Sequence, residues 1–174
     1  MAGILASLFS ERQWTLADLM NVDYSRQRKS TGCQANLLET YVEVEPEGIV
    51  DKFKRFFTRN KSVMNIMFVI FKFEVISETG HSYTVFLRTQ YDPEMRLVYK
   101  NIVQIYCECA DFKFKSAWKL EQHSALFRSD RVDLKLGPAI TNAPKKPSPT
   151  VLCKHAFAAV NLFINNYGSF MSYV

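Results

Sequence analysis

The centre of the chain alternates between apolar and polar residues with a period of two, the pattern of a half-buried β-strand. One alternating run covers residues 67–75 and a second covers 83–89, where Arg88 is predicted to face outward. The polar, glycine-containing connection at 77–81 is typical of a hairpin. A third run extends from about 97 to 110. The pattern therefore predicts an antiparallel meander.

The segments on either side have helical spacing. After residue 154 the apolar residues recur on one stripe, and Gly168 is expected to end this helix. Residues 3–20 predict one or two short helices, and residues 37–44 look strand-like. Residues 49–60 combine an apolar stripe with a basic face.

These elements predict an α+β fold in which an antiparallel β-meander packs against a C-terminal helix. We expect two parts. Residues 1–62 form an N-terminal arm, helical or extended, that holds short helices and the basic amphipathic segment. Residues 63–174 form the α+β domain.

Composition supports a globular protein and limits its partners. The 174 residues include 48% hydrophobic and 22% charged residues, which suits one domain with a sizeable core. The net charge of +5 favours acidic surfaces only weakly. The longest apolar run, 63–76, holds charged residues and is shorter than the roughly 20 residues that span a bilayer, so we expect no membrane partner.

Three of the four cysteines lie in two compact pairs, Cys107-Glu108-Cys109 and Cys153-Lys154-His155. Residues i and i+2 of a strand share a face, so Cys107 and Cys109 are expected to project together. Within a helix, two residues would turn Cys153 about 200° away from His155. The C-terminal helix is therefore predicted to begin after Cys153.

Three thiolates and one imidazole form a closed donor set that suits tetrahedral Zn²⁺, with no position left for water. The predicted site is structural, and it staples the third strand to the C-terminal helix. Asp111 is expected to accept a hydrogen bond from the His155 ring. Two alternatives remain open: a disulfide involving Cys153, and cysteines that serve only as small buried apolar residues.

The order Cys107-x-Cys109, spacer, Cys153-x-His155 resembles the SWIM-type zinc finger, although the 43-residue spacer is longer than usual. The last 110 residues resemble small zinc-binding structural proteins of tailed bacteriophages. The similarity lies in the hairpin, the Cys-x-Cys-x-Asp-Phe strand end at 107–112, the basic aromatic stretch at 113–119, the proline-rich loop at 142–149 and Leu-Cys-Lys-His at 152–155.

The resemblance implies a virion structural component of neck, tail or baseplate type, assembled in the host cytoplasm. Its expected partners are other virion proteins and further copies of itself in a symmetric assembly. One alternative is a nucleic-acid-binding SWIM module, and another is a host-directed protein-interaction module. Two basic aromatic stretches could contact nucleic acid or a protein partner; their basic residues are Lys52, Lys54, Arg55, Arg59, Lys113, Lys115 and Lys119.

No pattern typical of an enzyme is present. The chain lacks a glycine-rich phosphate loop, a Gly-x-Ser-x-Gly elbow and a His-Glu-x-x-His helix. Cys33 has no second ligand near it and is expected to be a free thiol. His81 and His123 have no carboxylate or nucleophile at a telling spacing, so we expect them to be solvated rather than catalytic.

Overall fold

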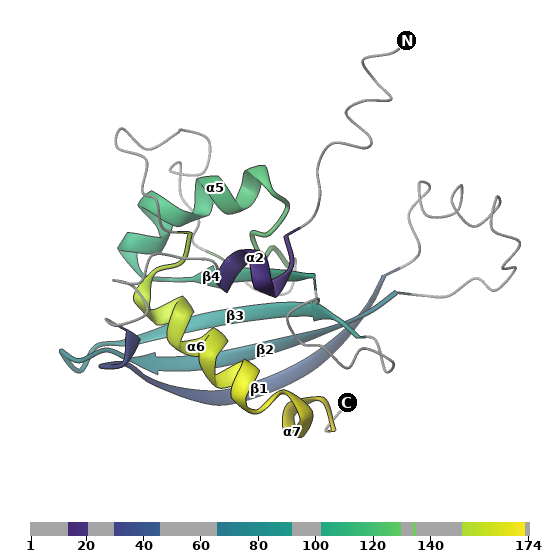
Figure 1. Cartoon of the computed structure of the whole chain (residues 1–174), viewed down its shortest axis with the longest axis horizontal. Coiled ribbons are helices and arrows are strands. Elements are labelled where there is room, and N and C mark those ends of the chain that lie inside the picture. Colours follow the sequence, from purple (N-terminus) through teal and green to yellow (C-terminus); the bar gives the residue numbers. More distant parts are fainter. Residues whose placement is uncertain are drawn as a thin grey trace, which may run out of the picture.

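The computed structural model describes residues 14–20, 30–45, 66–91, 102–129, 134 and 151–172. In this part of the chain, one antiparallel sheet has the strand order β1-β2-β3-β4 (Figure 1). The strands are β1 (Gln34–Glu45), β2 (Ile66–Ile76), β3 (Ser82–Gln90) and β4 (Val103–Cys107). The sheet packs against the C-terminal helices, which confirms the predicted α+β fold.

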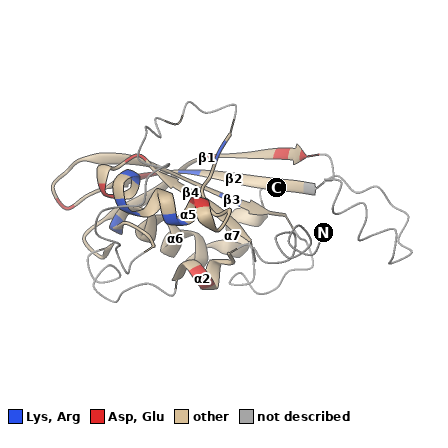
Figure 2. Ribbon diagram, turned by 90° about the horizontal axis from the view of Figure 1, so that it is seen from above, with Lys and Arg blue, Asp and Glu red and all other residues tan. Residues whose placement is uncertain are grey.

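The helices gather on one side of this sheet, below β1 and β2 in the view of Figure 2. We call that side of the sheet the inner face and the opposite side the outer face. The helices are α2 (Leu16–Met20), the π-helix η2 (Phe112–Ser116), α5 (Ala117–Gln122), α6 (Lys154–Asn165) and α7 (Tyr167–Met171).

The inner face carries the main hydrophobic core. Phe71 of β2 lies opposite Leu87 of β3, and both side chains are fully buried. The ring of Phe163 from α6 lies 5.1 Å from the Phe71 ring, and Phe170 from α7 lies 5.9 Å from it, measured between centroids. Burial of one such aromatic side chain stabilises the fold by roughly 2–3 kcal/mol. The apolar stripe of α6 thus packs against the odd-numbered residues of β2, as the helical period of α6 and the two-residue period of β2 predict.

β1 belongs to the sheet, although the sequence pattern placed its residues in the N-terminal arm. It pairs antiparallel with β2 from Gln34 to Glu45, with a bulge between Leu37 and Glu39. Alternation shows which face of a strand is apolar, but it does not show which strand lies beside it. The predicted boundary at residue 62 falls outside the described residues.

Arg88 points to the outer face of the sheet, as the alternation predicts, but this face is covered there. Only 6% of the Arg88 surface is exposed, and Phe86, two residues earlier on the same face, is also buried. A segment that follows α5 covers this face. The Phe127 ring stacks on Phe86 at 5.4 Å, and Ser129 hydrogen-bonds Glu43 of β1 at 3.2 Å.

The ends of two elements differ from the sequence prediction. β4 ends at Cys107 rather than near residue 110, and the start predicted at about 97 lies outside the described residues. α6 ends at Asn165, with Asn166 as its C-cap, so Gly168 lies within α7 and does not end the helix. The basic aromatic stretch at 113–119, for which the sequence predicted no element, is helical and lies in η2 and α5. Among the described residues, no helix combines the length and the apolar character needed to cross a bilayer.

Candidate metal centre

The first two candidate ligands lie where β4 turns into the following helix. Cys107 is the last residue of β4 and shares the inner face with Val103 and Ile105, because it pairs with Val85 just as Ile105 pairs with Leu87. Cys109 lies beyond the strand, where the chain turns toward η2. Its Sγ accepts a hydrogen bond from the amide of Phe112 at 3.3 Å. The two thiols therefore converge through a turn, and not through the strand alternation that the sequence predicted.

The other two candidate ligands lie at the start of α6. Cys153 is the N-cap, with an extended backbone at φ −73° and ψ 165°, and its Sγ accepts a hydrogen bond from the amide of Ala156 at 3.3 Å. His155 lies in the first turn. The prediction that the helix begins after Cys153 is confirmed. Lys154, between the two, donates from Nζ to Glu78 at 2.8 Å and ties the helix start to the turn between β2 and β3.

The four side chains meet at one buried point. The ligand atoms of Cys107, Cys109, Cys153 and His155 all lie within 4.8 Å of one another. None of the four residues is more than 6% exposed. A tetrahedral Zn²⁺ with three sulfur ligands and one nitrogen ligand spaces these atoms about 3.6–3.8 Å apart, so the cluster needs to contract by no more than about 1 Å.

The pKa values of the three thiols in this cluster are shifted in different directions. Burial raises the pKa of Cys107 well above its ordinary value, and burial also raises the pKa of Cys153. Hydrogen bonds from Cys107 and then from Cys153 lower the pKa of Cys109, because they stabilise its thiolate. Cysteine binds a metal as the thiolate, so a metal ion displaces the proton of each ligand that is still a thiol.

His155 shows how well this site fits a cation. Its Nδ1 and Nε2 are both buried, and neither has a hydrogen-bond partner among the described residues. Such an unpaired polar atom costs about 1–3 kcal/mol, and a bound metal removes that cost for one of the two nitrogens. The Tyr83 ring lies against the imidazole with centroids 4.2 Å apart, which fixes the plane of His155.

The predicted hydrogen bond from His155 to Asp111 is absent, since neither ring nitrogen is partnered. Asp111 instead pairs with Lys115, one helical turn further along the chain. The ring of His155 is therefore oriented by an aromatic contact with Tyr83. Sequence spacing gave no signal for this contact, because 72 positions separate the two residues.

The alternatives left open by the sequence fit this geometry less well. All four cysteines are free thiols, and no disulfide joins Cys153 to Cys107 or Cys109. Buried cysteines that only fill space have no reason to bring three sulfur atoms and an imidazole nitrogen to one point. The convergence is compatible with a zinc ion. Cys33 is also a free thiol, and it lies outside this four-residue group.

The other candidate residues are not part of the cluster. Lys113, Lys115 and Lys119 lie on η2 and α5, while Lys52, Lys54, Arg55 and Arg59 fall outside the described residues. His81 is exposed in the hairpin turn. The imidazole of His123 is partly buried and stacks on Trp14 with centroids 4.0 Å apart, so it is not freely solvated.

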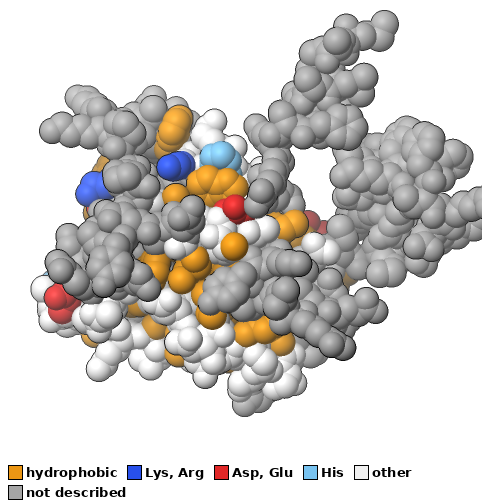
Figure 3. All heavy atoms as spheres, viewed as in Figure 1, with side chains coloured by type: hydrophobic (Ala, Val, Ile, Leu, Met, Phe, Trp, Pro, Cys, Tyr) orange, Lys and Arg blue, Asp and Glu red, His pale blue; other side chains and the backbone are white. Residues whose placement is uncertain are grey.

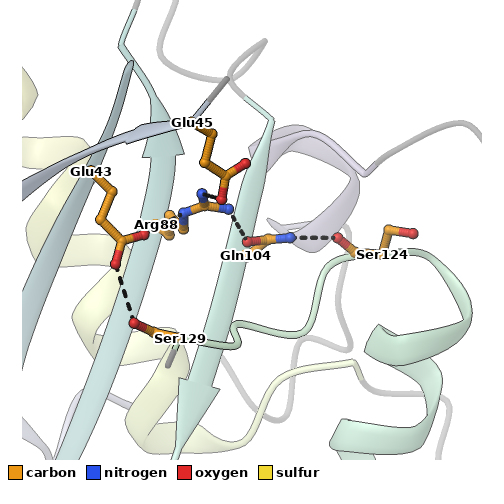
Figure 4. A network of polar contacts seen from close by, with 6 residues as sticks. All are labelled: Glu43, Glu45, Arg88, Gln104, Ser124 and Ser129. Atoms are coloured by element: carbon orange, nitrogen blue, oxygen red, sulfur yellow. Dashed lines mark hydrogen bonds and ion pairs between the residues drawn. The ribbon is translucent and has the colours of Figure 1, made fainter. Parts of the chain in front are cut away.

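A second buried polar cluster was missed by the sequence analysis. Arg88 forms ion pairs with Glu43, at 3.4 Å, and with Glu45, both of β1 (Figure 4). Its guanidinium also donates to Gln104 of β4 at 2.9 Å and lies 3.7 Å from the centre of the Phe68 ring. An arginine in an otherwise apolar strand was the available signal, but its partners belong to strands distant in sequence.

Arg88 lies on β3 and thereby links β1, at one edge of the sheet, to β4 at the other edge. Gln104 continues the network by donating to the backbone oxygen of Ser124 at 3.3 Å, as Figure 4 shows. The network holds the outer face together, whereas Cys107 lies on the inner face of the sheet. Comparison with protein-family models, curated proteins and solved structures finds no significant match to this chain.

Proposed function

We propose that this chain is a structural component of a bacteriophage virion, of neck, tail or baseplate type, with a structural Cys3His zinc site. The observation that carries the structural part of this proposal is the convergence of Cys107, Cys109, Cys153 and His155 within 4.8 Å in the protein interior. Four protein ligands complete the tetrahedral shell that Zn²⁺ prefers, so neither substrate nor water has a place on the metal. The proposed role is therefore mechanical and not enzymatic.

The chain supplies the two ends of this clamp from elements far apart in sequence. Cys107 and Cys109 fix the end of β4 and the turn into η2, while Cys153 and His155 fix the start of α6. The 43 residues between Cys109 and Cys153 are closed into a loop when both pairs hold one ion. Since α6 crosses the inner face, anchoring its first turn sets its position on the whole sheet.

The virion assignment is supported by the order of motifs in the last 110 residues, which resembles that of small zinc-binding phage structural proteins. A rigid unit of this kind suits repeated use in a symmetric assembly, because each copy must present the same surfaces. The proposed partners are further copies of the chain and other virion proteins. The proposed location is the virion, after assembly in the host cytoplasm.

Native mass spectrometry combined with elemental analysis tests this function. We expect one zinc per chain and a discrete assembly of several copies, either alone or on capsid or tail components. Purified protein that lacks any transition metal after expression in zinc-supplemented medium would contradict the clamp. A zinc-containing protein that is absent from purified particles would contradict the virion assignment alone.

A nucleic-acid-binding SWIM module is the second candidate, and one surface favours it. Phe114 is 66% exposed on η2, and its two neighbours in the chain, Lys113 and Lys115, are cations. Base stacking with phosphate neutralisation uses such residues. Binding of this kind weakens steeply as salt rises, so a DNA affinity that stays flat between low and physiological salt argues against it.

A further inference from the structure

Two surfaces at opposite edges of the sheet hold the large hydrophobic side chains that are exposed in the described part of the chain. Leu38, Val42 and Val44 lie on β1 and are 51%, 39% and 57% exposed, while Phe114 on η2 is 66% exposed. Single exposed apolar residues are ordinary on a protein surface. Three on one strand are notable, because an exposed apolar edge strand promotes association unless something covers it.

The two surfaces have opposite charge. β1 carries three glutamates, Glu39, Glu43 and Glu45, and no lysine or arginine. η2 and α5 together carry Lys113, Lys115 and Lys119 against Glu121, a net charge of +2. We define the β1 surface as the edge formed by Val42 and Val44, which lie opposite inner-face residues of β2, by Glu39 and Glu45, which point to the outer face, and by Leu38 at the bulge. We define the η2–α5 surface as Lys113, Phe114, Lys115 and Lys119.

The charged groups of both surfaces remain available although some have partners within the chain. Glu39 pairs with Lys72 at 3.2 Å and Glu45 pairs with Arg88, yet the side chains of both glutamates are 54% exposed. Lys115 pairs with Asp111 and stays 50% exposed. A carboxylate accepts about four hydrogen bonds, so these intrachain pairs leave acceptor positions free for a second cation.

The two surfaces lie on opposite edges of the molecule. β1 is one edge strand of the sheet, whereas η2 follows β4 at the other edge. In Figure 1, β1 lies at the bottom of the sheet and α5 at the top. Figure 2 shows acidic residues at the end of β1 and basic residues along α5, and Figure 3 shows basic side chains beside hydrophobic ones over the α5 region.

We infer that copies of this chain associate head to tail, with the η2–α5 surface of one copy on the β1 surface of the next. Complementary patches at different places on one molecule generate a heterologous contact, which closes into a ring when the rotation between copies permits. The exposed edge of β1 pairs with no other described strand. A helix laid along this edge covers it from both faces: Phe114 lies against the β1 valines on the inner side, and the lysines reach the glutamates on the outer side.

This inference deepens the proposed virion role and rests on it, since it names the contact by which the copies assemble. Phe114 supplies the apolar anchor of the contact. The exposed charges orient the two copies and speed their association more than they add affinity. A second copy is favoured over a nucleic acid as occupant of the η2–α5 surface, because this contact also covers the exposed apolar residues and the acidic residues of the β1 edge.

Two blocking variants test the contact. Leu38→Lys with Val44→Lys neutralises the β1 surface, because two positive charges are added to Glu39 and Glu45, and it removes apolar area. Phe114→Glu with Lys119→Glu likewise neutralises the η2–α5 surface, where Lys113 and Lys115 remain, and removes its exposed aromatic ring. The control, Thr79→Glu with His81→Glu, adds two negative charges to the exposed turn between β2 and β3, away from both surfaces. Zinc content and circular dichroism establish that each variant is folded before its mass is measured by light scattering and native mass spectrometry.

We expect the wild type and the control to form the same oligomer at high micromolar concentration. Each blocking variant alone should be monomeric, with association weakened about tenfold or more. An equimolar mixture of the two blocking variants should form a dimer and nothing larger, because one intact β1 surface and one intact η2–α5 surface remain.

Three results would overturn the inference: a monomeric wild type, a blocking variant that keeps the wild-type mass, or a mixture that stays monomeric. A monomer that binds DNA through the η2–α5 surface would assign that surface to nucleic acid instead. These outcomes are distinct from failure of the zinc clamp, because folded, zinc-loaded variants that do not associate leave the metal site intact. A lack of zinc contradicts the clamp whatever the mass.

Discussion

Removing the metal should lower the free energy of unfolding. We expect the loss to be about the entropic free energy of closing the loop that the metal holds together. The ligands Cys109 and Cys153 are separated by 43 residues. For a cross-link that closes a loop of this length, the chain-entropy relation gives about 4 kcal/mol at 25 °C. With an unfolding entropy of about 2.1 cal/mol/K per residue, 4 kcal/mol corresponds to a fall in Tm of about 10 °C.

The assay compares thermal unfolding of the zinc-loaded protein with unfolding after complete chelation, with metal content measured on the same samples. Cys107→Ser should match the chelated wild type and gain little from added zinc, because its buried ligand is lost. Cys33→Ser is the matched control, since Cys33 is a free thiol outside the ligand group. Its Tm should stay at the wild-type value and should still fall on chelation.

An unchanged Tm after verified removal of all zinc would refute this reasoning. So would an equal loss of stability in Cys107→Ser and Cys33→Ser, because the effect would then follow from replacing a cysteine and not from losing a ligand. A fall of about 4 kcal/mol in the chelated wild type and in Cys107→Ser, with none in Cys33→Ser, fits the clamp.

Three further predictions concern the buried clusters. Arg88→Met should lower the free energy of unfolding in urea by about 3–5 kcal/mol, because it leaves the partly buried Glu43 without its cation. Lys72→Met, at an exposed pair, should lower it by less than about 1 kcal/mol. Equal losses in the two variants would contradict the burial argument. Tyr83→Ala should weaken zinc binding about tenfold or more in a chelator competition, and Tyr83→Phe should not, because only the ring contacts His155. Co²⁺ in place of zinc should give the intense visible bands of a tetrahedral site with thiolate ligands, and a spectrum typical of six oxygen ligands would contradict the cysteine assignment.

The sequence by itself determined the parts of the fold that depend on local pattern. The alternation at 67–75 and 83–89 specified β2 and β3, and the helical stripe after residue 154 specified α6. The extended conformation of Cys153 also followed from local geometry, since a helical residue two positions before His155 points the wrong way. Such inferences succeed because backbone dihedrals fix side-chain direction over a few residues.

The tertiary structure alone decided the relations between distant segments. The pairing of β1 with β2, the burial of Arg88 by the segment around Phe127, and the contact of Tyr83 with His155 all join residues far apart in the chain. Alternation identifies an apolar face but not what covers it. Asp111 was a plausible partner for His155 by sequence proximity, yet the helical turn after Cys109 pairs it with Lys115.

The candidate metal site depends on both the sequence and the tertiary structure. The sequence indicated the four candidate ligands, because two short chelating pairs are visible in it. Only packing of α6 across the sheet decided that both pairs reach the same point, within 4.8 Å. The physical reason is that local dihedrals orient each pair, whereas the distance between the pairs is set by the volume of the side chains that fill the core between helix and sheet.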